Sequence, residues 1–145
     1  MMTDEEYMQM AIIEAKKSLE SEDVPVGSII VLDGQVIARA YNQKEKNKVA
    51  THHSEILAIE QASKRIGSYR LDNATIYTTK EPCLMCMGAI LSARISRIVY
   101  GANDRRFGTR DLAKNNNFNH KCDITTGVCR EECEELLSNF FKNLR

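Results

Sequence analysis

Two short runs of residues could bind a metal ion and move protons. Residues 53–55 read H-S-E, and residues 82–86 read P-C-L-M-C. His53, Cys83 and Cys86 offer one imidazole and two thiolates, a donor set that binds Zn²⁺ and leaves its fourth position for water. Glu55 offers a carboxylate that could take a proton from this water. The pattern H-x-E followed by P-C-x-x-C therefore predicts one zinc ion per chain in a hydrolytic site.

Helix geometry explains the spacing within each run. Cys83 and Cys86 are three residues apart, so on a helix both sulfur atoms project from one face. Pro82 is favoured at a helix start, and the helix N-terminus lowers the pKa of nearby thiols. Glu55 lies roughly 200° around a helix from His53, which makes it a poor co-ligand. We therefore predict that Glu55 is the catalytic base beside three metal ligands.

A structural zinc site is the alternative interpretation of the same residues. His52 precedes His53 directly, so both histidines and the two cysteines could close a Cys₂His₂ site without an open position. Neighbouring residues on a helix point about 100° apart, however, and both rarely bind one ion. A structural site would also give Glu55 and Pro82 no role. On this interpretation the chain is a zinc-stabilised binding module rather than an enzyme.

The remaining cysteines could imitate a second metal site. Cys122, Cys129 and Cys133 are accompanied by no second histidine and no further C-x-x-C. Buried free cysteine is common, so we predict that these three residues pack in the core. His120 is predicted to be a hydrogen-bonded structural residue rather than a metal ligand.

The composition is typical of a globular protein and indicates a single domain, residues 1–145. Of the 145 residues, 43% are hydrophobic and 28% are charged, which is ordinary for such a domain. Lys+Arg and Asp+Glu are equal at 20 each, so no overall positive field attracts nucleic acid. The acidic start is unlike a secretory signal, and no apolar run approaches the roughly 20 residues that span a membrane. An odd number of cysteines favours a reducing, cytoplasmic compartment.

The elements that must position the two runs alternate between helix and strand. A capping box at Thr3–Glu6 opens a helix to about Leu19, whose side chain is expected on the buried face. Further helices are predicted at 53–66, 83–93 and 130–144, and strands at 29–31, 36–38, 74–79, 98–100 and, weakly, around Ile124. Asp33-Gly34 predicts a hairpin turn, and residues 43–49 and 103–119 read as loops. This alternation predicts an α/β layered domain in which helices flank a mixed sheet.

Further motifs extend along nearly the whole chain. They include D-V-P-V-G at residues 23–27, Asn42, Y-R-L at 69–71, E-P-C-L-M-C-M-G-A at 81–89, R-I-V-Y-G-A at 97–102, F-N-H at 118–120 and F-F-K-N-L-R at 140–145. With these motifs the chain resembles the bacterial tRNA-specific adenosine deaminases of the cytidine/deoxycytidylate deaminase superfamily. The resemblance implies a three-layer domain around a central five-stranded sheet and a homodimer. It also implies deamination of adenosine to inosine at the wobble position of the tRNA anticodon loop.

The resemblance also assigns roles to individual residues. It implies that His53, Cys83 and Cys86 bind zinc, and that Glu55 shuttles protons while zinc-bound hydroxide attacks a flipped-out adenine. Asn42 then contacts the nucleoside. The predicted substrate-binding residues are Asn42, Val26, Pro82 and Phe107. Phe107 could stack on a flipped base, or it could be a core aromatic side chain. The cations that could face RNA are Arg94, Arg97, Arg105, Arg106, Arg110, Lys142 and Arg145.

Three departures from the family separate this chain from its relatives. Ser54 stands where the family usually has alanine, and Met87 replaces a usually small residue. The segment from Asp104 to Asn117 is a few residues shorter than the corresponding loop, which borders the pocket in the family. This loop and the neutral net charge favour an alternative substrate, a free nucleobase or nucleoside of the guanine or cytosine type.

Overall fold

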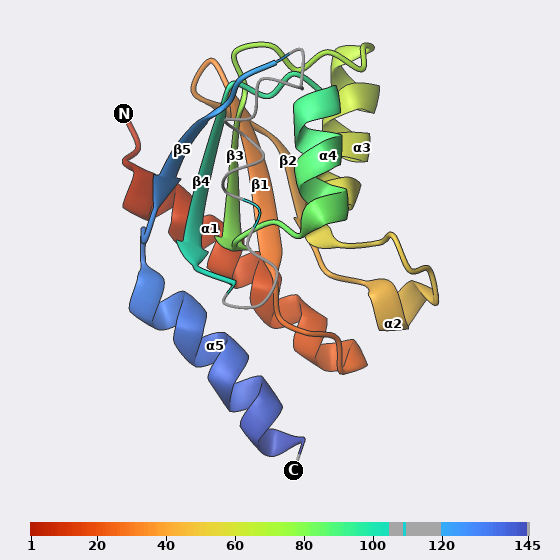
Figure 1. The fold of residues 1–145 in the computed structure, drawn as a ribbon, viewed down its shortest axis with the longest axis vertical. Helices are drawn as coiled ribbons and strands as arrows, with labels where there is room; N and C mark the ends of the chain where they lie inside the picture. Colours follow the sequence, from red (N-terminus) through yellow and green to blue (C-terminus); the bar gives the residue numbers. More distant parts are fainter. Residues whose placement is uncertain (105–108, 110–119, 145) are drawn as a thin grey trace.

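The chain folds around one five-stranded sheet with helices on both faces (Figure 1). The structure is a computed structural model, and it describes residues 1–104, 109 and 120–144. The strands are β1 (Gly27–Leu32), β2 (Gln35–Tyr41), β3 (Thr75–Lys80), β4 (Arg97–Ala102) and β5 (Asp123–Thr126). Their order in the sheet is β2-β1-β3-β4-β5. β1 is antiparallel to β2 and β3, whereas β3, β4 and β5 run parallel. The predicted α/β class with a five-stranded mixed sheet is confirmed.

The turn between β1 and β2 is the one that Asp33-Gly34 predicts. Asp33 has a φ of 51° and Gly34 a φ of 76°. Positive φ at both central residues is the requirement of the type I′ hairpin turn, whose twist matches that of the strands. The hairpin therefore follows from two residues, and it places β2 at the edge of the sheet.

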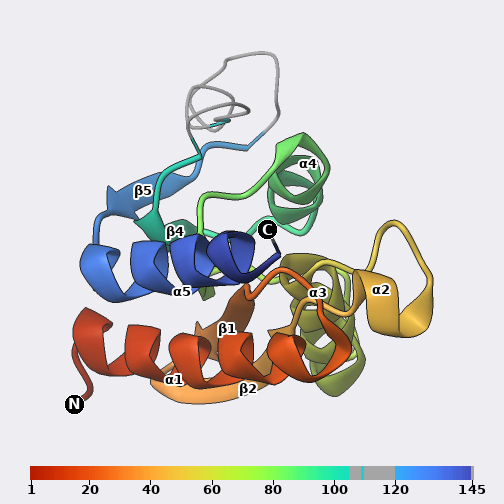
Figure 2. The ribbon, with the colours of Figure 1, turned by 90° about the horizontal axis from the view of Figure 1, so that it is seen from below.

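Side chains alternate across the sheet and supply two hydrophobic cores. Ile29 and Val31 of β1 point to one face, whereas Ile30 points to the other. Helices α1 (Asp4–Lys17) and α5 (Arg130–Asn143) cover the first face, where the core contains Tyr7, Met8, Ala11, Ile12, Tyr77, Val99 and Cys133 (Figure 2). Helices α3 (Ser54–Ile66) and α4 (Leu84–Ser92) cover the second face, where the core contains Ala58, Ala62, Ile76, Met87, Ile90, Ile98 and Tyr100. The result is a three-layer α/β arrangement.

The first helix is shorter than the sequence predicts. Its predicted capping box is present, because Thr3 Oγ1 accepts from the Glu6 N–H at 3.2 Å and Glu6 Oε1 accepts from the Thr3 N–H at 3.1 Å. The helix ends at Lys17 and continues as a 3₁₀ turn, Ser18–Ser21. Leu19 is 44% exposed, so the prediction that it lies on the buried face is wrong. The tighter turn changes the angle between residues, and Ser18 faces inward instead, donating to the Asn42 carbonyl at 2.9 Å.

A short helix, α2 (Lys44–Asn47), forms where the sequence predicts a loop. Asp23 is 1% exposed, and its carboxylate accepts from the N–H groups of Glu45 at 2.5 Å and Lys46 at 3.1 Å. A carboxylate at a helix N-terminus satisfies free N–H groups and interacts favourably with the helix dipole. Because this partner comes from a distant part of the chain, the local pattern could not predict the helix.

The remaining cysteines and His120 have the packing roles that the sequence predicts. Cys122 is buried in the core beneath α3 and α4, and Cys133 is buried in the core beneath α1 and α5. Cys129 packs against the second of these cores. His120 Nε2 lies 2.7 Å from the Ile95 carbonyl oxygen, a hydrogen-bond distance. In the part of the chain that the structure describes, no helix has the length and apolar character needed to cross a bilayer.

Thr78 provides a test of the packing on β3. Its side chain is 0% exposed, and its Oγ1 is the one buried side-chain oxygen or nitrogen without a hydrogen-bond partner among the described residues. An unsatisfied buried hydroxyl costs about 1–3 kcal/mol. We therefore expect Thr78→Val to raise the free energy of unfolding by about 1 kcal/mol, measured by chemical denaturation. A lower free energy of unfolding would show that the hydroxyl has a partner such as a buried water molecule.

Candidate active site

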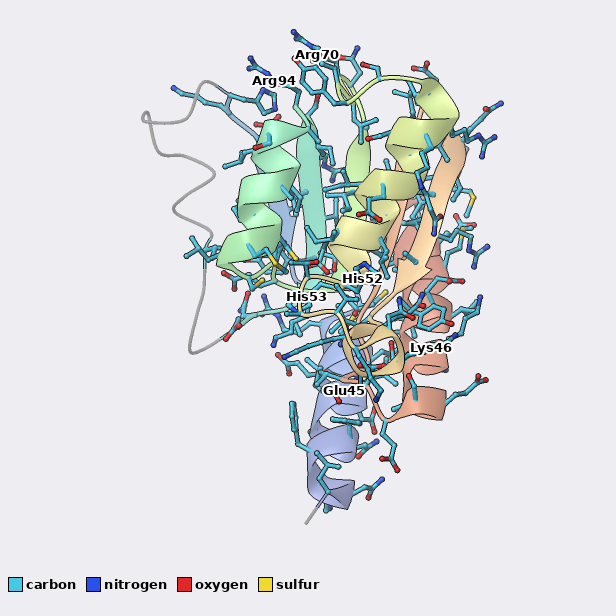
Figure 3. All side chains as sticks on the ribbon, turned by 90° about the vertical axis from the view of Figure 1, so that its right-hand side faces the viewer. Glu45, Lys46, His52, His53, Arg70 and Arg94 are labelled. Carbon is cyan, nitrogen blue, oxygen red and sulfur yellow. The ribbon has the colours of Figure 1, made fainter. Side chains whose placement is uncertain are left out.

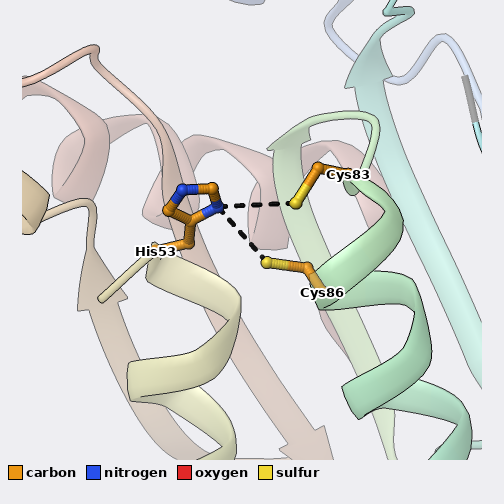
Figure 4. Close-up of side chains that lie close together, drawn as sticks. All are labelled: His53, Cys83 and Cys86. Atoms are coloured by element: carbon orange, nitrogen blue, oxygen red, sulfur yellow. Dashed lines mark hydrogen bonds between the residues drawn. The ribbon is translucent and has the colours of Figure 1, made fainter. Parts of the chain in front are cut away.

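The ends of two helices bring together one imidazole and two thiols. His53 is the residue that precedes α3, and Cys83 is the residue that precedes α4. Cys86 lies in the first turn of α4, as its spacing from Cys83 predicts. His53 Nδ1 is 3.6 Å from Cys83 Sγ and 3.5 Å from Cys86 Sγ (Figure 4). The structure thus places three predicted ligands, separated by some thirty residues in sequence, around one point.

The spacing of these three atoms fits a tetrahedral zinc site. Zinc binds histidine nitrogen at about 2.0–2.1 Å and cysteine sulfur at about 2.3 Å. With a tetrahedral angle at the metal, these bond lengths place the nitrogen about 3.6 Å from each sulfur. The observed nitrogen–sulfur distances are 3.6 and 3.5 Å. The residues present therefore fit the ion, and Nδ1 is the histidine atom that would bind it.

Hydrogen bonds among the three side chains shift their pKa values. The Cys86 thiol donates to Cys83, and together with the hydrogen bond from His53 this lowers the pKa of Cys83 to about 3. The same bond to Cys83 raises the pKa of Cys86, to which burial also contributes. The hydrogen bond with Cys83 also raises the pKa of His53. Cys83 is thus the more acidic of the two thiols, and a divalent cation would displace the proton of Cys86 and bind both sulfurs as thiolates.

His52 faces a different neighbour. Its Nδ1 lies 2.9 Å from Asn47 Nδ2 at the end of α2, and Figure 3 labels it beside His53. Among the described residues, the group that could hold a metal ion consists of His53, Cys83 and Cys86 alone. This is a set of three protein ligands rather than four, as in catalytic zinc sites that keep a position for water or substrate.

Glu55 lies in the pocket that borders this group. It belongs to the first turn of α3 and is 4% exposed. Burial raises the pKa of its carboxyl group, although a hydrogen bond from Ser54 opposes the shift. The pocket has a volume of about 170 Å³ and is lined by Val24, Val26, Asn42, Lys44, His53, Ser54, Glu55, Lys80, Glu81, Cys83 and Asp104. A buried carboxyl group with a raised pKa, beside three side chains that could bind a metal ion, is suited to accept and return a proton.

Two of the predicted substrate-binding residues line this pocket. Asn42 follows β2 and is buried. Its Nδ2 donates to the Val24 carbonyl at 3.1 Å, and its Oδ1 accepts from the Lys44 N–H at 3.2 Å. The Asn42 N–H also donates to the Val26 carbonyl at 2.9 Å. These bonds fix the wall formed by Val24 and Val26 against the end of β2.

The other two predicted contacts are placed differently. Pro82 is buried and lies one residue before the cap of α4, not within the first turn of the helix. It is not among the described residues that line the pocket, although Glu81 and Cys83 on either side of it are. Its carbonyl accepts from Thr109 Oγ1 at 2.5 Å. Phe107, together with most of the segment from Asp104 to Asn117, lies outside the described residues.

The pocket also contains residues that the sequence analysis missed. The carboxylate of Glu81 accepts from the Asp104 N–H at 3.0 Å and from the Thr109 N–H at 2.7 Å, so it holds these two residues near the start of α4. Its place directly before Pro82 was a usable signal. Lys44 and Lys80 line the pocket, and Lys80 Nζ lies 3.7 Å from Asp104 Oδ2. Nothing in the local pattern distinguished these lysines from other surface cations.

Known deaminases are similar to the chain along its whole length. A protein-family model described as MafB19-like deaminase matches residues 2–145. The tRNA-specific adenosine deaminase of Bacillus subtilis is 43% identical over 149 residues, which cover 100% of this chain and 92% of that protein. A tRNA-specific adenosine deaminase of Streptococcus pyogenes is 37% identical over 143 residues, which cover 96% of this chain and 90% of that protein.

Solved structures give the same similarity in three dimensions. A structure from a study of A-to-I editing by tRNA deaminases at the wobble position of transfer RNA superposes with a TM-score of 0.86 at 38% identity. The superposition covers 90% of this chain and 98% of that one. The guanine deaminase of Nitrosomonas europaea superposes with a TM-score of 0.84 at 18% identity, over 97% of this chain and 85% of that one. The second likeness extends to the fold alone.

Proposed function

The chain belongs to the family of tRNA-specific adenosine deaminases, and from that premise we propose that it converts adenosine to inosine at the wobble position of a tRNA. The observation that carries the proposal is the full-length similarity, 43% identity over 100% of the chain, to a deaminase of that name. The clustering of His53, Cys83 and Cys86 beside the pocket that Glu55 lines supports the chemistry. We extend the proposal to one zinc-dependent domain, residues 1–145, acting as a cytoplasmic homodimer.

The proposed reaction consumes one water molecule and releases ammonia. A bond forms between the water oxygen and the purine carbon that carries the amino group, and the bond from this carbon to the amine breaks. A zinc ion held by His53, Cys83 and Cys86 would supply a Lewis acid that lowers the pKa of a water molecule toward neutrality. The Glu55 carboxylate takes a proton from the attacking water, passes it to a ring nitrogen, and returns a proton to the departing amine.

The shape of the pocket supports a single base as the group that enters. Its volume of about 170 Å³ is below the range of about 300–1,000 Å³ that drug-sized ligands occupy. A deaminase that acts on a nucleic acid must take the target base out of its stack and bind it in a closely fitting pocket. Val24 and Val26 offer an apolar wall for the face of a base, and Asn42 lies beside them.

The positions of the described basic residues bear on which of them could contact the RNA. Arg97 is held within the protein, because its guanidinium nitrogens lie 3.0 and 2.6 Å from the two carboxylate oxygens of Asp4. Arg94 follows Ala93, the C-cap of α4, at the opposite end of this helix from Cys83, a separation of roughly 16 Å (Figure 3). Lys142 is exposed near the end of α5, and Arg105, Arg106, Arg110 and Arg145 lie outside the described residues. Lys44 and Lys80 line the pocket itself.

The direct test is incubation of the zinc-loaded protein with an anticodon stem-loop that carries adenosine at the wobble position. We expect inosine at that position and one ammonia for each inosine. The same stem-loop with adenosine at another loop position is the matched control. Failure to form inosine, with ammonia released from free guanine, cytosine or their nucleosides, would contradict the proposal. The neutral balance of 20 basic and 20 acidic residues is the observation that favours this small-substrate alternative.

Lys44 distinguishes an RNA substrate from a free base. On an RNA substrate a lysine at the pocket mouth neutralises a phosphate and releases counterions, which makes binding depend on salt. We expect Lys44→Gln to raise KM for the stem-loop about threefold to tenfold and to reduce the slope of log KM against log salt by about one. The control is Lys64→Gln, since Lys64 lies near the far end of α3. Equal salt slopes for Lys44→Gln and the unsubstituted protein would show that Lys44 touches no phosphate.

A further inference from the structure

Two buried serine hydroxyls form a chain of hydrogen bonds that ends at Glu55. Ser28 belongs to β1 and Ser54 is the first residue of α3, and both side chains are 0% exposed. Their Oγ atoms are 2.8 Å apart. Ser54 Oγ lies 2.7 Å from Glu55 Oε1 and donates to it. The carboxyl group is therefore linked to strand β1 of the sheet through two hydroxyl groups.

The direction of the hydrogen bonds follows from the proton count. A hydroxyl group has one proton, and an ionised carboxylate can only accept. Because Ser54 uses its proton for Glu55, Ser28 must be the donor in the bond between the two serines. Ser28 thus acts on Glu55 only through Ser54. A hydrogen bond to a charged acceptor is stronger than a neutral one, and burial strengthens it further.

We propose that Ser54, supported by Ser28, is a positioning residue that fixes the rotation of the Glu55 carboxyl group. The hydroxyl holds one carboxylate oxygen on the protein side, which leaves the other oxygen to exchange protons in the pocket. This inference rests on the proposed function, in which Glu55 moves the protons.

Thr78 shows that a fully buried hydroxyl in this part of the sheet does not always form a hydrogen bond. It lies directly opposite Ser28 on the neighbouring strand, where side chains of paired residues share a face. It is equally buried, yet its Oγ1 has no partner. Burial alone therefore does not account for the hydrogen bonds that link Ser28 and Ser54 to Glu55. Thr78 offers a matched control.

Steady-state kinetics on the stem-loop substrate test the role of each hydroxyl. We expect Ser54→Ala to lower kcat about tenfold while KM changes less than about twofold. Ser28→Ala should lower kcat by a smaller factor, and the double variant should match Ser54→Ala because Ser28 acts only through Ser54. The double variant removes both serine hydroxyls, so neither is left without its partner, which protects the fold. Thr78→Val should leave kcat unchanged.

A second measurement reads the carboxyl group without turnover. With ¹³C-labelled glutamate, the Glu55 carboxyl resonance is the signal missing in Glu55→Gln. We expect it to shift in Ser54→Ala and to stay in place in Thr78→Val. An unshifted resonance in Ser54→Ala, or an unchanged kcat with a shifted one, would overturn the inference. If the unsubstituted protein forms no inosine, the proposed function fails, and the resonance alone then decides whether Ser54 holds the carboxyl group.

Discussion

Replacing Glu55 by glutamine is expected to reduce the turnover of the wobble adenosine by about 10²- to 10⁴-fold, the usual contribution of a positioned acid–base group. Glutamine has nearly the same shape, but its amide cannot take a proton from water or return one to the amine. Because Glu55 is not among the three clustered ligand atoms, the variant should keep its zinc. The measurements are kcat from inosine formation and the metal content of the purified variant.

The control for this substitution is Glu14→Gln. Glu14 is a buried glutamate on α1 that pairs with Lys17 and Arg39 rather than lining the pocket. Its variant should retain turnover even where its stability falls. Full turnover in Glu55→Gln would remove the proton-shuttle role and would favour the zinc-stabilised binding module. Loss of zinc together with turnover would instead assign Glu55 to the metal.

Replacing Cys86 by alanine is expected to abolish detectable turnover by removing the metal. The variant keeps two of the three ligands, and its zinc content should fall from about one ion per chain to nearly none after dialysis. Turnover should fall with it, because the metal supplies most of the acidity of the attacking water, a shift of about nine pKa units or about 12 kcal/mol at most. Metal analysis and inosine formation, measured on the same sample, test the expectation.

Cys122 offers the matched control, because it is a buried cysteine that precedes β5 and does not belong to the group of three clustered ligands. Cys122→Ala should keep both zinc and turnover. If Cys86→Ala retained zinc and activity, the metal would be bound elsewhere. If it lost zinc and kept activity, the reaction would not depend on the ion. Either result would refute the catalytic metal site.

The clustering of His53, Cys83 and Cys86 and most of the fold could be predicted because their signals are local. The three-residue spacing of Cys83 and Cys86 places both sulfurs at the same helix end, and the structure has Cys83 as the N-cap and Cys86 in the first turn of α4. The unbroken run of β-branched residues in β1 marks a strand buried on both faces, as Ile29, Ile30 and Val31 are. Asp33-Gly34 specifies its turn through the φ values that these residues tolerate. Each of these features depends on neighbours in the sequence.

The tertiary structure decided what depends on distant partners. Asp23 caps α2 and turns a predicted loop into a helix, while Asp4, remote in the sequence, pairs with Arg97, one of the cations predicted to face RNA. Ser54 is next to Glu55 in the sequence, but the hydroxyl that donates to Ser54 comes from Ser28 on β1, which the local pattern could not predict. A helical or alternating pattern states which face a residue occupies. It does not show which side chain from a distant part of the sequence will contact that face, because this contact depends on how whole helices and strands pack together.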